Sequence, residues 1–413
     1  MSTELFFPGP RSRRWLRAGP LAPDLDRFAA RLAAEGYSHP SARDKLRLLR
    51  NLSTWLEREG HGIETLDEQR FDVFLRTRAP RSRRRGEAAT GRQMLSHLRR
   101  EGRIPPAPAD ADGDGPIRGI ERIYQEFLVN ERGLSPATVV NYLGVVHDFL
   151  TERFGKGAVA LERLVARDAN QFILRRAQDL SRSRAKLVAT ALRSFLRHLF
   201  QRGDIAVDLA SAIPPVMNWR LSGLPKSLAP GKVETLLECC DRCTVVGRRD
   251  HAILLLLARL GLRAGEIVAV TLDDLDWDKG LVTVSGKGPR RELLPLPQEV
   301  GDALVAYLKD GRPRCRTRRL FVRIQAPHRG FGSSVAVCNV VRRALVRAGI
   351  DVPFKGAHLL RHSLACGMLR NGASLEEIGQ ILRHRHPETT QIYAKLDLGA
   401  LLTLAPAWPG DAS

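Results

Sequence analysis

The segment from Pro105 to Gly115, PPAPADADGDG, has the composition of a boundary between separately folded parts of the chain. It has no large apolar residue and neither helical nor strand periodicity, which is typical of a linker between domains. A second proline-containing segment lies at residues 214–226, and 413 residues suffice for two to four domains. We therefore predict domains at residues 1–104, 117–213 and 227–400, linkers at 105–116 and 214–226, and a tail at 401–413.

The helical patterns on the two sides of the first linker resemble each other. GYSHPSARDKLRLLRNLSTWLEREG has its counterpart in GLSPATVVNYLGVVHDFLTERFG, and RSRRRGEAATGRQMLSHLRREGRI in SRSRAKLVATALRSFLRHLFQRGDI. We interpret this as an internal duplication of a small helical domain, the alternative being a chance likeness of two amphipathic helices. The apolar positions paired in this way are Leu46, Leu49, Leu52, Trp55 and Leu56 with Val140, Leu143, Val146, Phe149 and Leu150.

The stretch from Gly356 to Lys395 gathers groups that can bind and attack a phosphate. His358 and Arg361 are three residues apart, so in a helix they share one face and can point into one pocket. A guanidinium there could hold two phosphate oxygens with its fork, and an imidazole could donate a hydrogen bond or move a proton. By itself, however, such a pair is more often found on a surface.

A helix, a turn and a second helix follow from the same stretch. The turn is predicted at Asn371-Gly372, and Ser374 with Glu377 forms a capping box that begins the second helix. Its apolar residues have helical spacing, which puts His384 at the end of the helix and outside the core. Tyr393 comes after a polar link that contains a proline, so it can lie on a separate, movable segment.

Taken in order, these motifs resemble the C-terminal box of the tyrosine recombinases, the phage integrase family. HLLRHS is followed by LRHRHPETTQIY, with nine positions from His384 to Tyr393. Upstream, GLRAGEI matches the first arginine of the family at Arg263, with Glu266 beside it. LVTVSGKGPRRELLPLP alternates as two strands of a hairpin, and Lys287 matches the lysine that the family carries in this turn. The resemblance covers roughly residues 118–400.

The resemblance implies a mainly α fold. Residues 117–213 look like the helical, SAM-like core-binding domain of the family, and residues 227–400 like its catalytic domain, with a small antiparallel sheet at Leu275 to Pro297. Residues 1–104 would be an additional module, a possible duplicate of the core-binding domain that contacts DNA or another subunit. Leu398, Leu401, Leu402 and Leu404 would form a C-terminal helix that packs on a neighbouring protomer.

The resemblance also implies the chemistry. The hydroxyl of Tyr393 would attack the scissile phosphate and form a 3′-phosphotyrosine and a free 5′-hydroxyl, without a metal or a cofactor. Four protomers, identical or mixed with other recombinases, would exchange strands on paired sites in double-stranded DNA. The expected roles are phosphate binding for Arg263 and Arg361, proton removal from Tyr393 for His358, a phosphate hydrogen bond for His384, protonation of the 5′-oxygen for Lys287, and orientation of Arg263 for Glu266.

The charge of the chain favours a polyanionic partner. The formal net charge is +21, and neutralising phosphates releases counterions. Basic residues near predicted helix starts are candidate phosphate contacts, although a solvated basic face is an alternative. These candidates are Arg81, Arg83, Arg84, Arg85, Arg182 and Arg184.

Membrane and metal sites are not expected. The longest apolar run, Ala252 to Ala258, is far shorter than the ~20 residues of a membrane span. The N-terminus has no apolar signal-peptide core, so a cytoplasmic protein is predicted. Of the six cysteines, only Cys239, Cys240 and Cys243 cluster, and no second ligand pair accompanies them. We predict reduced thiols and no bound metal.

Several functions use similar chemistry. The additional N-terminal module favours integration or transposition of a mobile element over Xer-type resolution of chromosome or plasmid dimers. A type IB topoisomerase shares the chemistry, but the contexts GLRAGEI and TTQIYAKLD are those of integrases. A non-catalytic DNA-binding regulator would be expected to have lost a polar position of the motif, and none is lost.

Overall fold

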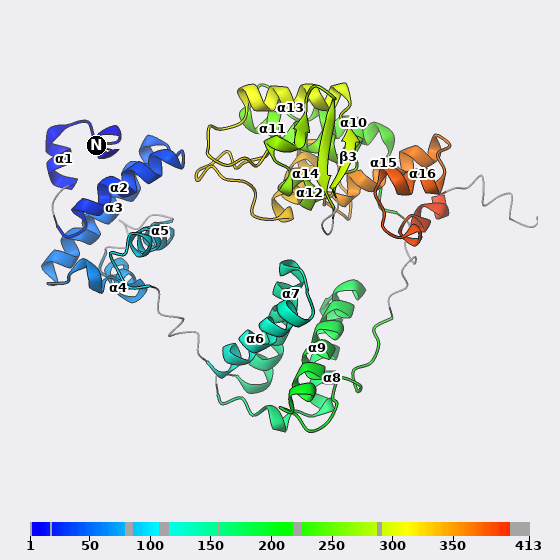
Figure 1. Cartoon of the computed structure of the whole chain (residues 1–413), viewed down its shortest axis with the longest axis horizontal. Coiled ribbons are helices and arrows are strands. Elements are labelled where there is room, and N and C mark those ends of the chain that lie inside the picture. The colour runs from blue at the N-terminus through cyan, green and yellow to red at the C-terminus, as the bar shows by residue number, and fades with distance from the viewer. Residues whose placement is uncertain are drawn as a thin grey trace, which may run out of the picture. The chain divides into compact units, whose positions relative to one another are not determined.

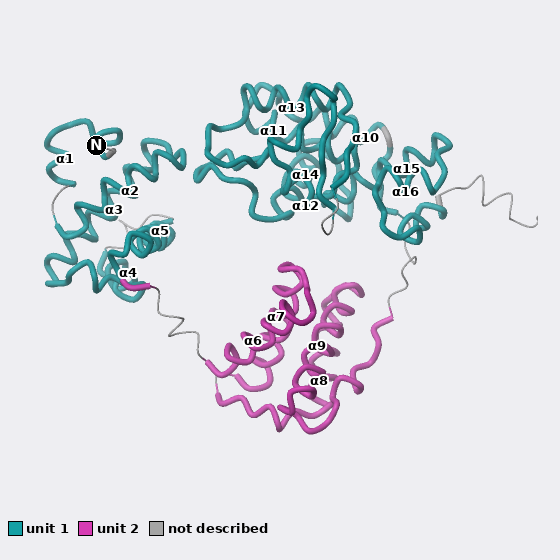
Figure 2. Tube along the Cα trace, viewed as in Figure 1, with its two compact units in different colours: residues 1–104, 223–413 teal, residues 105–222 magenta. Residues whose placement is uncertain are grey.

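The computed structural model describes residues 2–16, 19–78, 86–106, 115–155, 157–217, 225–286 and 291–396. The chain divides into two compact units, one of residues 105–222 and one that combines residues 1–104 with 223–413 (Figure 1 and Figure 2). Helices dominate both, which confirms the predicted mainly α fold. The hydrophobic residues of 1–104, of 117–213 and of the C-terminal part form separate clusters. The division into three domains at the predicted boundaries stays a prediction.

Residues 1–104 form a small helical bundle. Apolar residues recur every three or four positions along its longest helix, α3, and this spacing produces one buried stripe. Leu46, Leu49, Leu52 and Leu56 are each at most 1% exposed, as their spacing predicted. The helices are α1 (Pro10–Leu16), α2 (Ala22–Ala34), α3 (His39–Arg58), α4 (Glu68–Thr77) and α5 (Glu87–Arg100), with 3₁₀ turns η1 (Ser2–Leu5) and η2 (Ile63–Thr65).

Residues 115–217 form a second helical bundle around an aromatic core. Tyr124, Phe149, Phe172 and Phe195 are each at most 2% exposed, and the rings of Phe149 and Phe172 meet edge to face. The elements are α6 (Pro116–Glu126), the π-helical turn η4 (Phe127–Glu131), α7 (Pro136–Phe154), η5 (Leu161–Arg163), α8 (Ala166–Asp179) and α9 (Arg182–Arg202).

The order of elements is the same in both bundles. A helix, a longer helix, a 3₁₀ turn and two further helices follow one another as α2, α3, η2, α4, α5 and again as α6, α7, η5, α8, α9, with the π-helical turn η4 added after α6. The predicted pairing of Val140 with Leu46 is wrong, because Val140 is 70% exposed while Val139 is 4% exposed. Counted from the residues that precede the two helices, Ser38 and Ser135, the buried Ala42 and Val139 hold the same position, and each of the five predicted pairs is displaced by three residues. The helix start therefore fixes which face is buried.

The C-terminal part is built around α11 (Val245–Arg259). Every residue of the apolar run from Ala252 to Ala258 is at most 5% exposed, so this run is a core helix. None of the described helices is long and apolar enough to cross a membrane. The other helices are α10 (Pro230–Glu238), α12 (Ala264–Ala269), α13 (Gln298–Asp310), α14 (Ser334–Arg347), α15 (His358–Arg370) and α16 (Leu375–Ile381), with 3₁₀ turns η6 (Leu272–Asp274), η7 (Pro387–Thr389) and η8 (Gln391–Leu396).

A three-stranded antiparallel sheet lies within the predicted range of Leu275 to Pro297. Its strands are β1 (Leu275–Asp276), β2 (Leu281–Ser285) and β3 (Arg291–Pro295), in the order β1-β2-β3. Ser285 pairs with Arg291, so the hairpin turn falls between these two residues, as predicted. Alternate residues of β2 are buried, with Val282 at 1% and Val284 at 2% exposed. The period of two that predicted the strand thus reflects one face packed on the core.

Some predictions fall outside the described residues. They concern the tail leucines from Leu398 to Leu404, the basic cluster from Arg81 to Arg85, and Lys287.

Candidate active site

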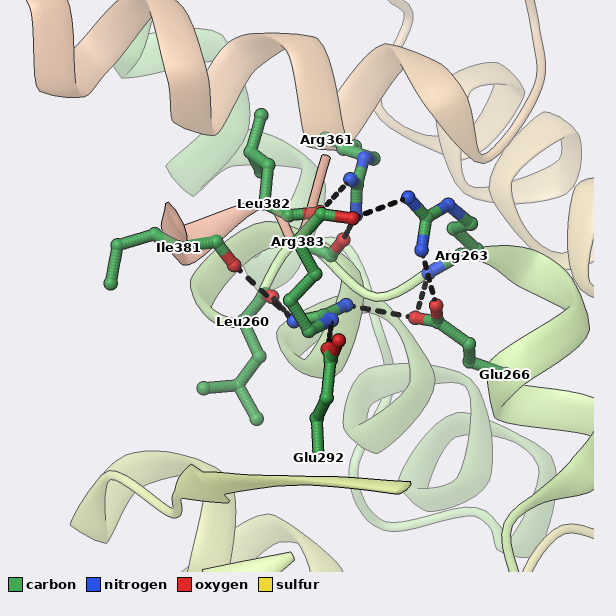
Figure 3. Close-up of polar contacts among 9 residues, drawn as sticks. Leu260, Arg263, Glu266, Glu292, Arg361, Ile381, Leu382 and Arg383 are labelled. Carbon is green, nitrogen blue, oxygen red and sulfur yellow. Dashed lines mark hydrogen bonds and ion pairs between the residues drawn. The ribbon is translucent and has the colours of Figure 1, made fainter. Parts of the chain in front are cut away.

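Helix α15 carries the first pair of candidate residues. It begins at His358, and Arg361 follows one turn later with only 4% of its surface exposed. The guanidinium of Arg361 donates hydrogen bonds to the carbonyl oxygens of Gly261 and Leu382 (Figure 3). Gly261 has φ +58°, and a Cβ there would lie 2.8 Å from the Leu382 side chain, so this turn requires glycine. Arg361 is therefore held by two segments far apart in the sequence.

Arg263 and Glu266 lie at the start of α12, just after α11. Glu266 is 5% exposed and accepts hydrogen bonds from the backbone N–H of Arg263 at 2.8 Å and from Nη1 of Arg263 at 2.7 Å. Nη2 of Arg263 donates to the carbonyl oxygen of Arg383 at 3.0 Å. Burial alone would raise the pKa of Glu266, but hydrogen bonds from Arg263 and the charges of Arg383 and Arg263 outweigh it and lower that pKa. The carboxylate that accepts hydrogen bonds from Arg263 is thus kept ionised.

His384 and Tyr393 lie beyond the helix-turn-helix, whose capping box at Ser374 and Glu377 is present as predicted. His384 comes just after α16, and its Nδ1 lies 2.8 Å from the hydroxyl of Thr390. Tyr393 lies on η8 and packs into a small hydrophobic cluster with Ala365, Cys366, Ile378 and Leu382. Although a movable position was expected, Tyr393 is only 1% exposed.

The hydroxyl of Tyr393 contacts a histidine that sequence reasoning missed. Nδ1 of His362 lies 2.7 Å from the Tyr393 oxygen, whereas the expected proton acceptor was His358. The His358 and His362 rings are 6.4 Å apart on α15. The sequence did contain a signal for this histidine, because His362 follows Arg361 directly and lies one helical turn beyond His358. Only the packing of η8 shows which histidine faces the tyrosine.

Burial sets the protonation states of the site. It raises the pKa of Tyr393, which the charge of Arg361 only partly offsets. Burial, His358 and Arg361 lower the pKa of His362 to about 4, and burial with the charges of Arg361 and Arg263 lowers that of His384 to about 4. Both imidazoles are thus neutral near pH 7 and can accept a proton. Burial and the charges of Arg263 and Arg383 lower the pKa of Arg361 to about 10, so it stays charged.

A cavity of about 750 Å³ opens beside these groups. The residues that line it come from four places in the chain. Among them are Arg263, Gly286 just after β2, Arg383 and His384. Three arginines line it, Arg263, Arg383 and Arg385, together with the carboxylates Glu292 and Glu376. The excess of guanidinium groups suits an anion such as a phosphate diester. Lys287 directly follows Gly286 in the sequence but lies outside the described residues.

The candidate DNA contacts divide into two groups. Arg182 and Arg184 lie in the first turn of α9, and both are exposed. Nη1 of Arg184 donates to the side chain of Asn141 at 3.3 Å. Arg81, Arg83, Arg84 and Arg85 are outside the described residues.

Comparison with protein families gives two matches. Residues 226–398 match the model of the phage integrase family, and residues 122–203 match that of the phage integrase N-terminal SAM-like domain. Residues 1–104, with their repeated helical order, lie before both matched ranges.

Among known proteins, the chain is similar over nearly its full length to “Putative integrase/recombinase y4rA” of Sinorhizobium fredii (strain NBRC 101917 / NGR234). The two are 44% identical, with 95% of this chain and 96% of that protein covered. Tyrosine recombinase XerD of Listeria monocytogenes serotype 4b (strain F2365) is 33% identical, over 65% of this chain and 91% of XerD.

Solved structures agree in fold. XerH bound to a palindromic difH substrate has a TM-score of 0.55 and 19% identity, covering 73% of this chain and 90% of that chain. A lambda integrase dimer bound to a core site has a TM-score of 0.51 and 17% identity, covering 67% of this chain and 94% of that chain.

Proposed function

Because this chain belongs to the phage integrase family of tyrosine recombinases, enzymes that cleave and rejoin DNA, we propose that it recombines DNA for a mobile element through Tyr393. The observation that carries the assignment of residues is the convergence of Arg263, Arg361 and His384 near Tyr393 from separate segments. Two arginines supply the positive charge that a pentacoordinate phosphorus needs, and a neutral histidine faces the nucleophile.

The proposed cleavage step is an in-line substitution at phosphorus. The Tyr393 oxygen forms a bond to phosphorus as the bond from phosphorus to the 5′-oxygen breaks, leaving a 3′-phosphotyrosine. The tyrosine proton passes to Nδ1 of His362, and Lys287 protonates the departing 5′-oxygen. Arg263 and Arg361 hold the nonbridging oxygens, and His384 donates to one of them. Since Tyr393 is 1% exposed, its ring or the side chains that cover it must shift before it meets DNA.

The role of His362 predicts both a mutational and a pH effect. His362→Ala should slow adduct formation by about 10²-fold, because the hydroxyl loses its proton acceptor. Because the pKa of His362 in the folded protein is lowered to about 4, its imidazole stays neutral and able to accept a proton until the pH falls through that value. At a DNA concentration below the Kd, the rate of adduct formation by the wild type should therefore be constant across about pH 6 to 8 and should fall only in more acidic solution.

Rapid-quench assays of adduct formation across this range would check the prediction. His386→Ala, at an exposed histidine of the same region, is the matched control. A wild-type rate that halves near the ordinary histidine pKa of about 6.5 would contradict proton transfer to His362, whose pKa is lowered. A large defect in His358→Ala with none in His362→Ala would make His358 the proton acceptor.

The mobile-element role rests on the N-terminal module. The similarity to y4rA, named an integrase/recombinase, spans 95% of this chain, whereas that to XerD spans 65%. Residues 1–104 repeat the element order of the core-binding domain, which supports a duplication and an added DNA or subunit contact. We propose that this chain acts in the cytoplasm on double-stranded DNA. It would assemble as a tetramer on paired sites, alone or with other recombinases. Arg182 and Arg184 would contact phosphates, and Arg81, Arg83, Arg84 and Arg85 are further candidates.

A junction assay tests this role. The chain would be expressed with a plasmid that carries the DNA flanking its gene, and amplification across the joined ends would detect excised circles. We expect junctions with the wild type and none with Tyr393→Phe. Resolution of plasmid dimers at a chromosomal dimer-resolution site, without junctions from the flanks, would instead support the Xer-type task.

A further inference from the structure

Arg383 has a buried side chain and an unusual backbone geometry, and the proposed mechanism does not use it. Its φ of +55° is in the left-handed region, where glycine is favoured, and among described residues it is the one non-glycine residue with positive φ. Its side chain is only 4% exposed. A large charged side chain at a position suited to glycine calls for a compensating role.

The guanidinium of Arg383 binds two carboxylates from different elements (Figure 3). Nη2 donates to Glu266 at 2.8 Å, and Nε lies 3.3 Å from a carboxylate oxygen of Glu292 on β3. Nη1 lies 3.4 Å from the carbonyl oxygen of Leu260 and 3.3 Å from that of Ile381. The side chain thus joins the α11–α12 turn, the end of α16 and the sheet.

Arg383 reaches Arg263 by two routes. Its carbonyl oxygen accepts from Nη2 of Arg263 at 3.0 Å, and its guanidinium shares Glu266 with Nη1 of Arg263. In the described part of the chain, Arg263 uses two of its five side-chain N–H donors for these contacts, and the other three are left for a phosphate. They also fix the plane of the fork, which sets where the phosphate must lie.

We propose that Arg383 is a positioning residue, which orients the fork of Arg263 toward the scissile phosphate through Glu266 and through its own carbonyl group. This inference rests on the proposed role of Arg263. Two cations on one buried carboxylate keep Glu266 ionised, consistent with its lowered pKa. Glu292 adds an ion pair from the side of the sheet, at 3.3 Å from Nε and without a hydrogen bond.

The test is Arg383→Gly, because glycine adopts φ +55° without strain and keeps the carbonyl acceptor. The substitution removes the whole side chain, including the guanidinium. We expect single-turnover cleavage of a suicide substrate to slow by about 10- to 100-fold, because a small misplacement of a catalytic group slows the reaction. The affinity for DNA should be nearly unchanged. Arg383→Lys, which keeps the charge but loses the fork, should fall between glycine and wild type, and it replaces Arg383→Gly if that variant does not fold.

Two readouts separate positioning of Arg263 from general support of the fold. A methylphosphonate at the scissile position is uncharged, so its cleavage needs Arg263 less, and the defect of Arg383→Gly should shrink to about threefold. The double variant Arg263→Ala/Arg383→Gly should cleave no more slowly than Arg263→Ala alone. Arg318→Gly is the matched control, since Arg318 pairs with Asp273 on the surface of the same domain.

The possible results lead to distinct conclusions. A wild-type rate for Arg383→Gly, an equal defect on both substrates, or additive defects in the double variant would each overturn the positioning role while leaving the proposed function intact. A wild-type rate for Arg263→Ala would instead remove Arg263 from the proposed mechanism, and the inference about Arg383 with it.

Discussion

Tyr393→Phe should abolish the covalent adduct between protein and DNA while the protein still binds DNA. The substitution removes one hydroxyl group and with it the 2.7 Å contact to His362. The ring keeps its packing against Ala365, Cys366, Ile378 and Leu382, so the fold should be retained. Loss of the nucleophile leaves no atom that can form the phosphotyrosine.

The measurement is trapping on a nicked suicide substrate in excess EDTA, followed by denaturing electrophoresis, with DNA affinity measured in parallel. EDTA is included because Arg263 and Arg361 are proposed to supply the positive charge. Tyr307→Phe is the matched control, since Tyr307 is also fully buried and its oxygen accepts from the backbone N–H of Val322. An adduct that persists in Tyr393→Phe would assign the nucleophile to another residue.

Arg361→Ala should slow adduct formation at saturating DNA by at least about 10³-fold, because a guanidinium that stabilises transition-state charge is lost from a water-excluded site. Arg361 also satisfies the carbonyl oxygens of Gly261 and Leu382. Leaving a buried acceptor unpaired costs about 1–3 kcal/mol of stability, so the variant should also melt at a lower temperature.

Arg361→Lys separates the effect of the positive charge from that of the planar guanidinium fork. Lysine keeps the charge but cannot hold two phosphate oxygens with one planar fork, so we expect a defect of about 10²-fold. Arg370→Lys, at an exposed arginine in the last turn of the same helix, should have little effect. Cleavage by Arg361→Lys at the wild-type rate would show that the fork contributes nothing to the transition state.

The sequence determined the local structure of the site. The three-residue spacing of His358 and Arg361, the capping box at Ser374 and the alternation of β2 each depend on contacts within a few residues along the chain. Such patterns fix a helix face or a strand face wherever the segment packs. The same physics explains the error at Val140, because the helix start, and not the distant apolar match, sets the buried face.

Only the tertiary structure decided which side chains meet. His362 contacts Tyr393 because η8 packs on α15, 31 residues away in sequence, and no local spacing encodes that approach. Arg383 joins Arg263 and Glu266 because its backbone is left-handed and three segments enclose its side chain. These contacts exist only once separate elements are packed, since their geometry comes from burial of the shared core and not from the order of residues.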